Sequence, residues 1–313
     1  MGAVVAAIDI GGTKIAAGLV TRSGQVVARR SVPTPAREGG QAVLGAAGEL
    51  AEGLLAGAGA ELVALGIGSA GVVDPGSGRV LAATDQLADW VGTDLAALGD
   101  RWRVPVAAMN DVHAHALGEA SPDGSMLFLA VGTGIGGAYV VDGAVLAGAH
   151  YAAGHAGHVP SAYGGGTPCT CGGRGHLEAI ASGPALVAAY KQLSGERVDD
   201  LHAVAERAAE GDRVASEVID YGGTAVGSAL GGLVNMLDPH VVVIGGGVAG
   251  LGTLWWNALR AEFRRQVLPR LADVPVSAAR YGNDAALIGA AKVAWARVVG
   301  DSVTGDRARL RTG

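Results

Sequence analysis

The stretch VAAMNDVHAHALGE, residues 106–119, decides the fold because it joins an apolar run to a helical pattern at two polar residues. Residues 104–109 are typical of a buried strand, and the hydrophobic period changes to that of a helix immediately afterwards. Asn110 and Asp111 are therefore predicted at the carboxyl end of a strand, the edge at which open α/β sheets bind ligands. A carboxylate there can accept a proton from a bound hydroxyl, but Asp is also a common helix N-cap. This segment alone leaves both roles of Asp111 open.

The composition indicates a compact protein that acts on small molecules. The 313 residues are enough for two domains of about 150 residues each. Half of the residues are hydrophobic and 17% are charged, which excludes disorder for most of the length. The net charge is −6, and basic residues form only pairs such as those at 29–30 and 264–265, so no basic surface for nucleic acid or anionic membrane is expected.

The chain is predicted to be cytoplasmic. Met1 leads directly into an apolar strand, without the basic start, apolar core and cleavage site of a secretion signal. Residues 125–141 and 241–259 carry no charge, but their glycine pairs favour a strand and a turn over a membrane-spanning helix.

A strand, a glycine turn and two further strands are predicted over residues 4–30. The turn at Gly11, Gly12 and Thr13 can present backbone N–H groups to an anion, with Lys14 nearby. Asp9, just before the turn, could hold a magnesium ion through water. A tight hairpin that binds no ligand is the alternative.

Residues 127–148 repeat this arrangement, with the glycine-rich turn GTGIGG at residues 132–137. The repetition predicts a duplicated fold whose two glycine turns face one cleft and hold a polyphosphate from both sides. A third glycine turn follows the apolar strand of DPHVVVIGGGVAG, residues 238–250, and could let the backbone approach a nucleotide; close packing of a helix on a strand is the alternative.

The remaining segments alternate between helical and strand patterns, and Trp90 among them is expected in the core or a pocket wall. Glycines at 68 and 71 could bring the backbone close to a substrate. The predicted elements are a helix at 41–58, a strand at 62–67, a helix after Trp90, helices across 182–237, a helix at 253–266, a strand at 274–277 and a helix at 283–296. We expect a first domain at 1–120, a second at 121–297 whose final helix packs back on the first, and a frayed tail at 298–313.

A glycine- and proline-rich loop within residues 150–183 gathers His155, His158, Cys169, Cys171 and His176. The two cysteines are too close in sequence for an ordinary disulfide. Together with two of the histidines they supply four ligands of the kind that tetrahedral zinc takes in a closed structural site. Free thiols and loop histidines are the alternative. The next helix would direct a carboxylate, that of residue 178, toward the cleft.

Five motifs occur in the order and spacing of a known family: DIGGTK, NDxxxxxxGE, GTGIGG, GH…CxCGxxGxxE and VVVIGGGV. Across residues 3–296 the chain resembles the ROK family of sugar kinases and sugar-responsive repressors. The resemblance implies an α/β protein with the actin-like ATPase fold, a duplicated ribonuclease H-like fold whose two domains flank a nucleotide and sugar cleft.

The resemblance also implies an activity and the residues that carry it. ATP and Mg²⁺ would be cofactors, a structural Zn²⁺ would bind His158, Cys169, Cys171 and His176, and Asp111 would be the catalytic base. The implied sugar ligands are Gly71, Asn110, Asp111, His155, His158 and Glu178. The implied nucleotide and phosphate ligands are Asp9, Gly11, Gly12, Thr13, Lys14, Thr133, Gly134, Gly136, Gly137, Gly246 and Gly247, the last two on the adenosine side. The sugar O6 would attack the γ-phosphorus as Asp111 accepts its proton.

The chain departs from the family pattern at four positions. His155 replaces a glutamate that contacts sugar hydroxyls, and an imidazole lacks the two acceptor oxygens of a carboxylate. His176 replaces the third zinc cysteine and keeps a competent ligand. Gln86 and His113 stand where asparagines are frequent, and both could reshape the sugar pocket.

Two functions from different classes follow from these features. The first is an ATP-dependent 6-kinase of a hexose or N-acetylhexosamine, such as glucose, N-acetylglucosamine or N-acetylmannosamine. The second is a sugar sensor without turnover, although family repressors carry a DNA-binding region before the first glycine motif and only residues 1–10 precede it here. A degenerate kinase is a third alternative, against which Asp111 and both glycine turns argue. A homodimer or homotetramer is expected from the resemblance.

Overall fold

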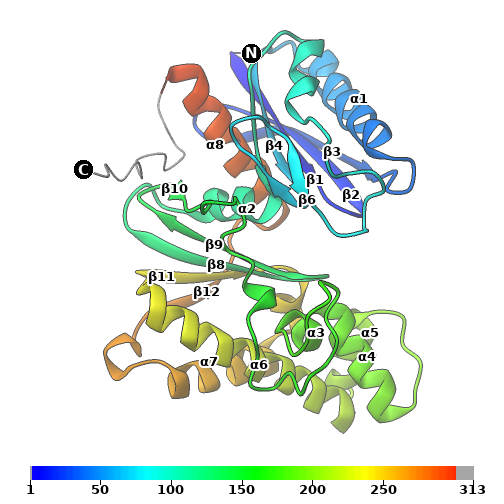
Figure 1. Cartoon of the computed structure of the whole chain (residues 1–313), viewed down its shortest axis with the longest axis vertical. Helices are drawn as coiled ribbons and strands as arrows, with labels where there is room; N and C mark the ends of the chain where they lie inside the picture. Colours follow the sequence, from blue (N-terminus) through cyan, green and yellow to red (C-terminus); the bar gives the residue numbers. More distant parts are fainter. Residues whose placement is uncertain (1, 301–313) are drawn as a thin grey trace. The chain divides into compact units, whose positions relative to one another are not determined.

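The computed structural model describes residues 2–300, which form two compact units. Of the described residues, the first unit contains 2–124, 139–153 and 280–300, and the second contains 125–138 and 154–279. Figure 1 follows the chain through them. Within residues 2–300, no helix combines the length and the apolar character that crossing a bilayer requires.

The first unit is built on a five-stranded sheet in the order β3-β2-β1-β4-β7. The first three strands are an antiparallel meander, whereas β1, β4 and β7 run parallel, so that their carboxyl ends lie at one edge. The strands are β1 (Ala3–Ile10), β2 (Lys14–Val20), β3 (Val26–Pro33), β4 (Glu61–Ser69) and β7 (Val106–Asn110), with a small hairpin of β5 (Val72–Val73) and β6 (Val80–Ala82) beside them.

Helices cover both faces of this sheet. Alternate residues of β1, such as Ile8 and Ile10, share a core with Val43 and Ala47 of α1 (Gly40–Ala58). On the other face, α8 (Ala285–Val299) packs against β1 and β4, and α2 (Asp111–Glu119) packs against α8.

Two glycines allow α2 and α8 to touch backbone to backbone. A Cβ atom on Gly118 would overlap the carbonyl oxygen of Ala285, and one on Gly289 would overlap that of Ala114. The first turn of α2 carries Asp111, so this contact fixes the helix that presents the predicted catalytic base.

The second five-stranded sheet, in the order β10-β9-β8-β11-β12, repeats the first sheet strand for strand. Its strand β11 runs parallel to β8 and to β12. Its strands are β8 (Ser125–Val131), β9 (Ile135–Val141), β10 (Ala144–Val145), β11 (Val241–Gly245) and β12 (Val276–Ala278). The repeated order confirms the predicted duplication.

Three helices of the second unit begin at polar caps. Ser182, Asp200 and Asp212 accept hydrogen bonds from backbone N–H groups at the starts of α4, α5 and α6. These helices are α4 (Gly183–Ser194), α5 (Leu201–Ala209) and α6 (Arg213–Leu237), and they are accompanied by α3 (Glu178–Ala181) and α7 (Thr253–Gln266).

Several predicted boundaries differ from the structure. Residues 139–153 group with the first unit, where β10 contacts α2. Residues 280–300 group with it as well, because α8 packs on β1 and β4. The final helix runs to Val299, so the predicted tail at 298–313 begins too early, and residues 301–313 lie outside the described part of the chain. The helix expected after Trp90 is only a 3-10 helix, Ala96–Arg101, and Trp90 itself lies in the core as predicted.

Candidate active site

Two carboxylates lie side by side at the carboxyl edge of the first sheet. Asp9 of β1 pairs in register with Gly68 of β4. A Cβ atom on Gly68 would lie 3.5 Å from the Cα atom of Asp111 and 3.8 Å from Oδ1 of Asp9. The same Cβ atom would lie 3.0 Å from the Cβ atom of Ala114, so a side chain at position 68 would crowd the first turn of α2 beside Asp111.

The electrostatics of this pair suit proton acceptance near neutral pH. Burial raises the pKa of Asp9 and that of Asp111 from 3.8 to about 6. The negative charge of Asp9 contributes to this rise in the pKa of Asp111, whereas Lys14 opposes the shift in the pKa of Asp9 and His115 opposes that of Asp111. A carboxylate with a raised pKa is a stronger base than an exposed one, which is what a general base requires.

Asn110, and not Asp111, is the N-cap of α2. Its Oδ1 accepts hydrogen bonds from the backbone N–H groups of Val112, at 2.9 Å, and His113, at 3.2 Å. Its Nδ2 donates to the carbonyl oxygen of Gly71 at 2.9 Å. Asp111 is the first residue of the helix, and its Oδ1 accepts the N–H of Val112 at 2.9 Å. The cap interpretation of Asp111 is therefore wrong, and one N–H of the Asn110 amide stays available to a ligand.

The first glycine turn is closed by its own backbone and by the end of β3. Gly11 N donates to the Lys14 carbonyl at 3.0 Å, and Thr34 Oγ1 donates to the Gly11 carbonyl at 2.8 Å. A Cβ atom on Gly12 would lie 2.7 Å from Oε1 of Gln86. The side chain of Gln86 therefore borders the turn. Thr34 directly follows β3, and its contact with the turn could not have been predicted from the sequence.

The two histidines of α2 differ in their surroundings, and His115 is the one that interacts with Asp111. His113 is buried, and its Nε2 lies 3.0 Å from the carbonyl oxygen of Ala153. His115 is half-buried, and burial, partly opposed by the charge of Asp111, lowers its pKa. Its position four residues after Asp111, one helical turn away, is the sequence signal that could have identified it.

In the second unit, the second glycine turn is held at several points. Gly183 N, at the start of α4, donates to the Gly132 carbonyl at 2.8 Å, and Gly132 N donates to the Gly134 carbonyl at 2.9 Å. Ile135 N donates to Oε2 of Glu178 at 2.8 Å. The position of a Cβ atom on Gly132 would be 3.8 Å from Gly247 N, so the second and third glycine turns are neighbours.

Glycine is required in the third turn. Gly246 has φ +89°, and a Cβ atom there would overlap the carbonyl oxygen of Val131 at the end of β8. A larger residue would therefore push the third turn away from the second one.

The four predicted metal ligands converge. One ligand atom from each of His158, Cys169, Cys171 and His176 lies within 4.8 Å of the others. Sγ of Cys169 is 3.7 Å from Nδ1 of His158, and Sγ of Cys171 is 3.2 Å from Nδ1 of His176. Tetrahedral zinc separates sulfur and nitrogen ligands by about 3.5 Å. Both cysteines are free thiols, so the donor set and its spacing fit zinc.

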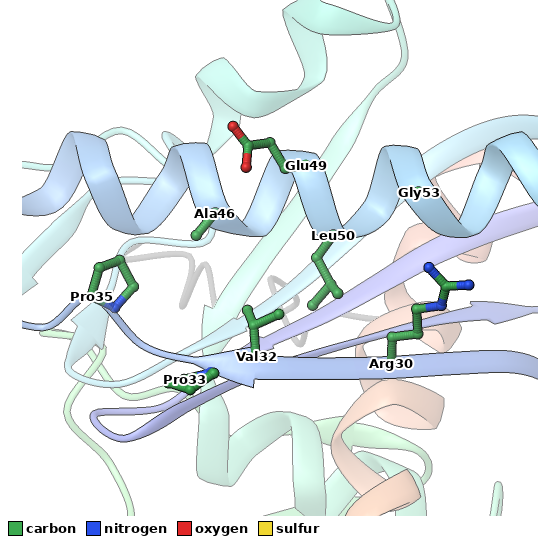
Figure 2. Close-up of a pocket in the computed structure, with 8 residues that line it drawn as sticks. All are labelled: Arg30, Val32, Pro33, Pro35, Ala46, Glu49, Leu50 and Gly53. Carbon is green, nitrogen blue, oxygen red and sulfur yellow. The ribbon is translucent and has the colours of Figure 1, made fainter.

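His155 adjoins this cluster, since its ring stacks on that of His158 with 6.0 Å between centroids. Of the predicted site residues, Asp9, Gly11 to Lys14, Gly71, Asn110 and Asp111 lie in the first unit, whereas Thr133 to Gly137, His155, the metal ligands, Glu178, Gly246 and Gly247 lie in the second. A separate groove between β3 and α1, lined by residues such as Arg30, Pro33 and Glu49, contains none of them (Figure 2).

Known proteins with the same fold show which class this arrangement belongs to. The glucokinase of Halalkalibacterium halodurans is 31% identical over 305 residues, covering 90% of this chain and 92% of that protein. The N-acetylmannosamine kinase of Yersinia pseudotuberculosis is 35% identical over 301 residues, covering 93% and 97%. The crystal structure of a ROK family glucokinase from Streptomyces griseus, in complex with glucose and AMPPNP, superposes with a TM-score of 0.80 at 31% identity over 93% of this chain and 99% of that one.

The duplicated sheets and the superposition define an actin-like ATPase fold, as the motifs predicted. Residues 5–297 match the ROK family, and the chain belongs to it.

Proposed function

We propose that the protein is an ATP-dependent sugar kinase that transfers the γ-phosphate to the 6-hydroxyl of a hexose or N-acetylhexosamine. The observation that carries this proposal is the pair of Asp111 and Asp9 at the carboxyl edge of the first sheet, whose pKa values are both raised to about 6. The glucokinase and N-acetylmannosamine kinase relatives, and the AMPPNP in the Streptomyces griseus complex, support ATP and a sugar as the ligands.

In the proposed mechanism, Asp111 accepts the proton of the sugar hydroxyl as its oxygen attacks the γ-phosphorus. Asn110 aligns Asp111 by capping α2 and can direct its remaining N–H to the sugar. Asp9 would hold Mg²⁺ through water, and the ion would supply positive charge to the phosphates. Backbone N–H groups of the two glycine turns would bind the phosphates, and Gly246 and Gly247 would approach the adenosine.

Sugar recognition is assigned to Gly71, Asn110, His155, His158 and Glu178. His158 can serve both the metal and the sugar, because its Nδ1 faces Cys169 and its Nε2 stays available to a hydroxyl. A zinc ion on His158, Cys169, Cys171 and His176 would have a structural role and would fix the loop that carries His155.

The test is ADP release by the purified protein with ATP, Mg²⁺ and glucose, mannose, N-acetylglucosamine or N-acetylmannosamine. We expect turnover with at least one sugar and a loss of roughly 10³-fold or more in kcat for Asp111→Asn, which removes the base. A lack of turnover with every sugar, while sugars still raise the melting temperature, would contradict the kinase and favour a sugar sensor.

A further inference from the structure

The residue between the two cysteine ligands links the metal cluster to the second glycine turn. Thr170 Oγ1 donates a hydrogen bond to Oε1 of Glu178 at 3.1 Å. The other oxygen of that carboxylate, Oε2, accepts the backbone N–H of Ile135 at 2.8 Å. Glu178 therefore bridges the loop that holds Cys169 and Cys171 to Ile135 within the second glycine turn.

We call the segment from Cys169 to Glu178 the first arm of the metal loop and residues 156–158 the second arm. The second arm contacts Ile135 at its carbonyl group. Gly157 precedes the ligand His158 in the 3-10 helix Ala156–His158. A Cβ atom on Gly157 would overlap the Ile135 carbonyl oxygen, so the two backbones are in direct contact. The Ile135 side chain is buried, 4% exposed. Its backbone N–H is bound by Glu178 and its carbonyl contacts Gly157, so both backbone groups face the arms of the metal loop.

The two arms are also tied to each other. Leu177 N donates to the Val159 carbonyl at 3.1 Å, and Pro160 and His176 form an antiparallel bridge. Both arms contribute ligands to the cluster: His158 comes from the arm with Gly157, and Cys169, Cys171 and His176 come from the arm that leads to Glu178. A metal ion on the four ligands would fasten both arms around Ile135 at once.

We propose that Thr170 is a positioning residue through which metal binding holds the second glycine turn in place. The inference rests on the proposed zinc site and on the proposed phosphate-binding role of residues 132–137. The threonine hydroxyl orients the Glu178 carboxylate, and this carboxylate in turn holds the Ile135 N–H. Metal binding fixes the position of Thr170 because it fixes its neighbours Cys169 and Cys171.

The direct test is hydrogen exchange of the segment 132–136, measured by mass spectrometry with one equivalent of Zn²⁺ and after chelation. Thr170→Val removes only the hydroxyl, and Thr170→Ser restores it. Thr167→Val is the matched control, since it makes the same change in the same loop at a hydroxyl that forms no side-chain hydrogen bond within residues 2–300.

With zinc bound, we expect the amide hydrogens of residues 132–136 to exchange about three- to tenfold faster in Thr170→Val than in the wild type. In Thr170→Ser and Thr167→Val they should exchange at the wild-type rate. Chelation should speed exchange in the wild type by roughly tenfold or more and should abolish the difference between the wild type and Thr170→Val. Equal exchange of the two zinc-bound proteins, or a difference that persists without zinc, would overturn the proposal.

Zinc affinity, measured by competition with a chromophoric chelator, separates positioning from ligation. We expect Thr170→Val to bind zinc within about threefold of the wild type, because Thr170 contributes no ligand atom. A larger loss would make Thr170 part of the metal site and would overturn its positioning role. Neither readout needs ATP or sugar, so failure of the kinase assay and failure of this coupling are distinguishable.

If the kinase is active, Thr170→Val should raise the KM for ATP more than it lowers kcat, because the turn that it loosens binds phosphate and does not accept the proton. The opposite split, with kcat lowered and KM unchanged, would contradict a role through the glycine turn.

Discussion

At the scale of single residues, Asp111 illustrates a conflict between function and stability. Its pKa is about 6 in the folded protein and 3.8 for an ordinary aspartate. Because the folded state takes up the proton more readily, ionisation above pH 6 destabilises it, and this cost fades as the pH falls from 6 toward 3.8. Removal of the charge should therefore stabilise the protein at neutral pH.

We predict that Asp111→Asn is more stable than the wild type by roughly 1–2 kcal/mol at pH 7.5 and that the gain shrinks by pH 5. Urea unfolding of the metal-free protein without ligands at both pH values measures this difference. The exposed Asp123→Asn serves as the control and should change neither value. If Asp111→Asn were no more stable than the wild type at pH 7.5, the folded protein would not destabilise the ionised form of Asp111.

The same pKa predicts how activity depends on pH. Below about pH 6, Asp111 gains a proton and cannot accept one from the sugar, so kcat/KM should fall about tenfold per pH unit, or more steeply if Asp9 must also be ionised. A profile of kcat/KM between pH 5 and 8 checks this. A profile that stays flat down to pH 5 would mean that no group with this pKa acts as the base.

At the scale of secondary-structure elements, the contact between α2 and α8 has little tolerance for added volume. Gly289→Ala places a methyl group on the Ala114 carbonyl, and we expect it to lower the free energy of unfolding by about 3 kcal/mol or more. Gly232→Ala in α6 is the control, because within the described residues a methyl group there meets no neighbouring atom within 4 Å. It should stabilise the protein by about 0.5–1 kcal/mol. Equal effects of the two changes, measured by urea unfolding, would contradict the close contact.

The other end of α2 is fastened by a buried carboxylate. Glu119 is 3% exposed, and its Oε1 accepts the backbone N–H groups of Arg280, at 2.9 Å, and Tyr281, at 2.7 Å, where the chain returns to the first unit. Lys292 of α8 donates to the Leu117 carbonyl at 2.7 Å and so caps the end of α2 from the other side.

We predict that Glu119→Ala lowers the free energy of unfolding by about 2–4 kcal/mol, because two buried N–H groups lose their acceptor. The exposed helical residue Glu49 provides the control Glu49→Ala, for which a change within about 0.5 kcal/mol is expected. Comparable unfolding midpoints of the two variants would show that Glu119 does not anchor the returning chain.

Most elements and the parts of the site close in sequence could be predicted, because hydrophobic periods and short motifs determine them. The helix at 253–266 and the convergence of the four metal ligands are examples, and both are confirmed. Contacts between distant segments could not be predicted, since nothing in the sequence states that Thr34 closes the first turn or that Asn110 bonds Gly71. The cap of α2 was misassigned because Asn and Asp are equally good N-caps and stand next to each other.

At the scale of the whole molecule, the same strand order in both sheets explains why two similar glycine motifs occur in one chain. The metal ligands lie in a segment at which the two halves of the repeat differ. The long loop with the metal ligands follows β10 in the second sheet, and the first sheet has no counterpart of it in the described residues, where β3 leads through a short connection to α1.

We predict that removal of zinc destabilises the protein strongly, because this loop contributes little hydrophobic core of its own. Chelation should lower the melting temperature by on the order of 10 °C, and one equivalent of Zn²⁺ should restore it. Cys171→Ser should behave as the chelated wild type with or without added zinc. A melting temperature that chelation leaves unchanged, in protein shown to contain zinc beforehand, would contradict a structural metal.

The central claim is that Asp111 directs phosphoryl transfer to a sugar, and identification of the product tests it most directly. The protein would be incubated with ATP, Mg²⁺ and each sugar, and the product analysed by two-dimensional ¹H–³¹P NMR. We predict a phosphomonoester coupled to the two protons on carbon 6, absent with Asp111→Asn. Inorganic phosphate as the only new phosphorus species, or a phosphate on another carbon of every sugar, would contradict the account.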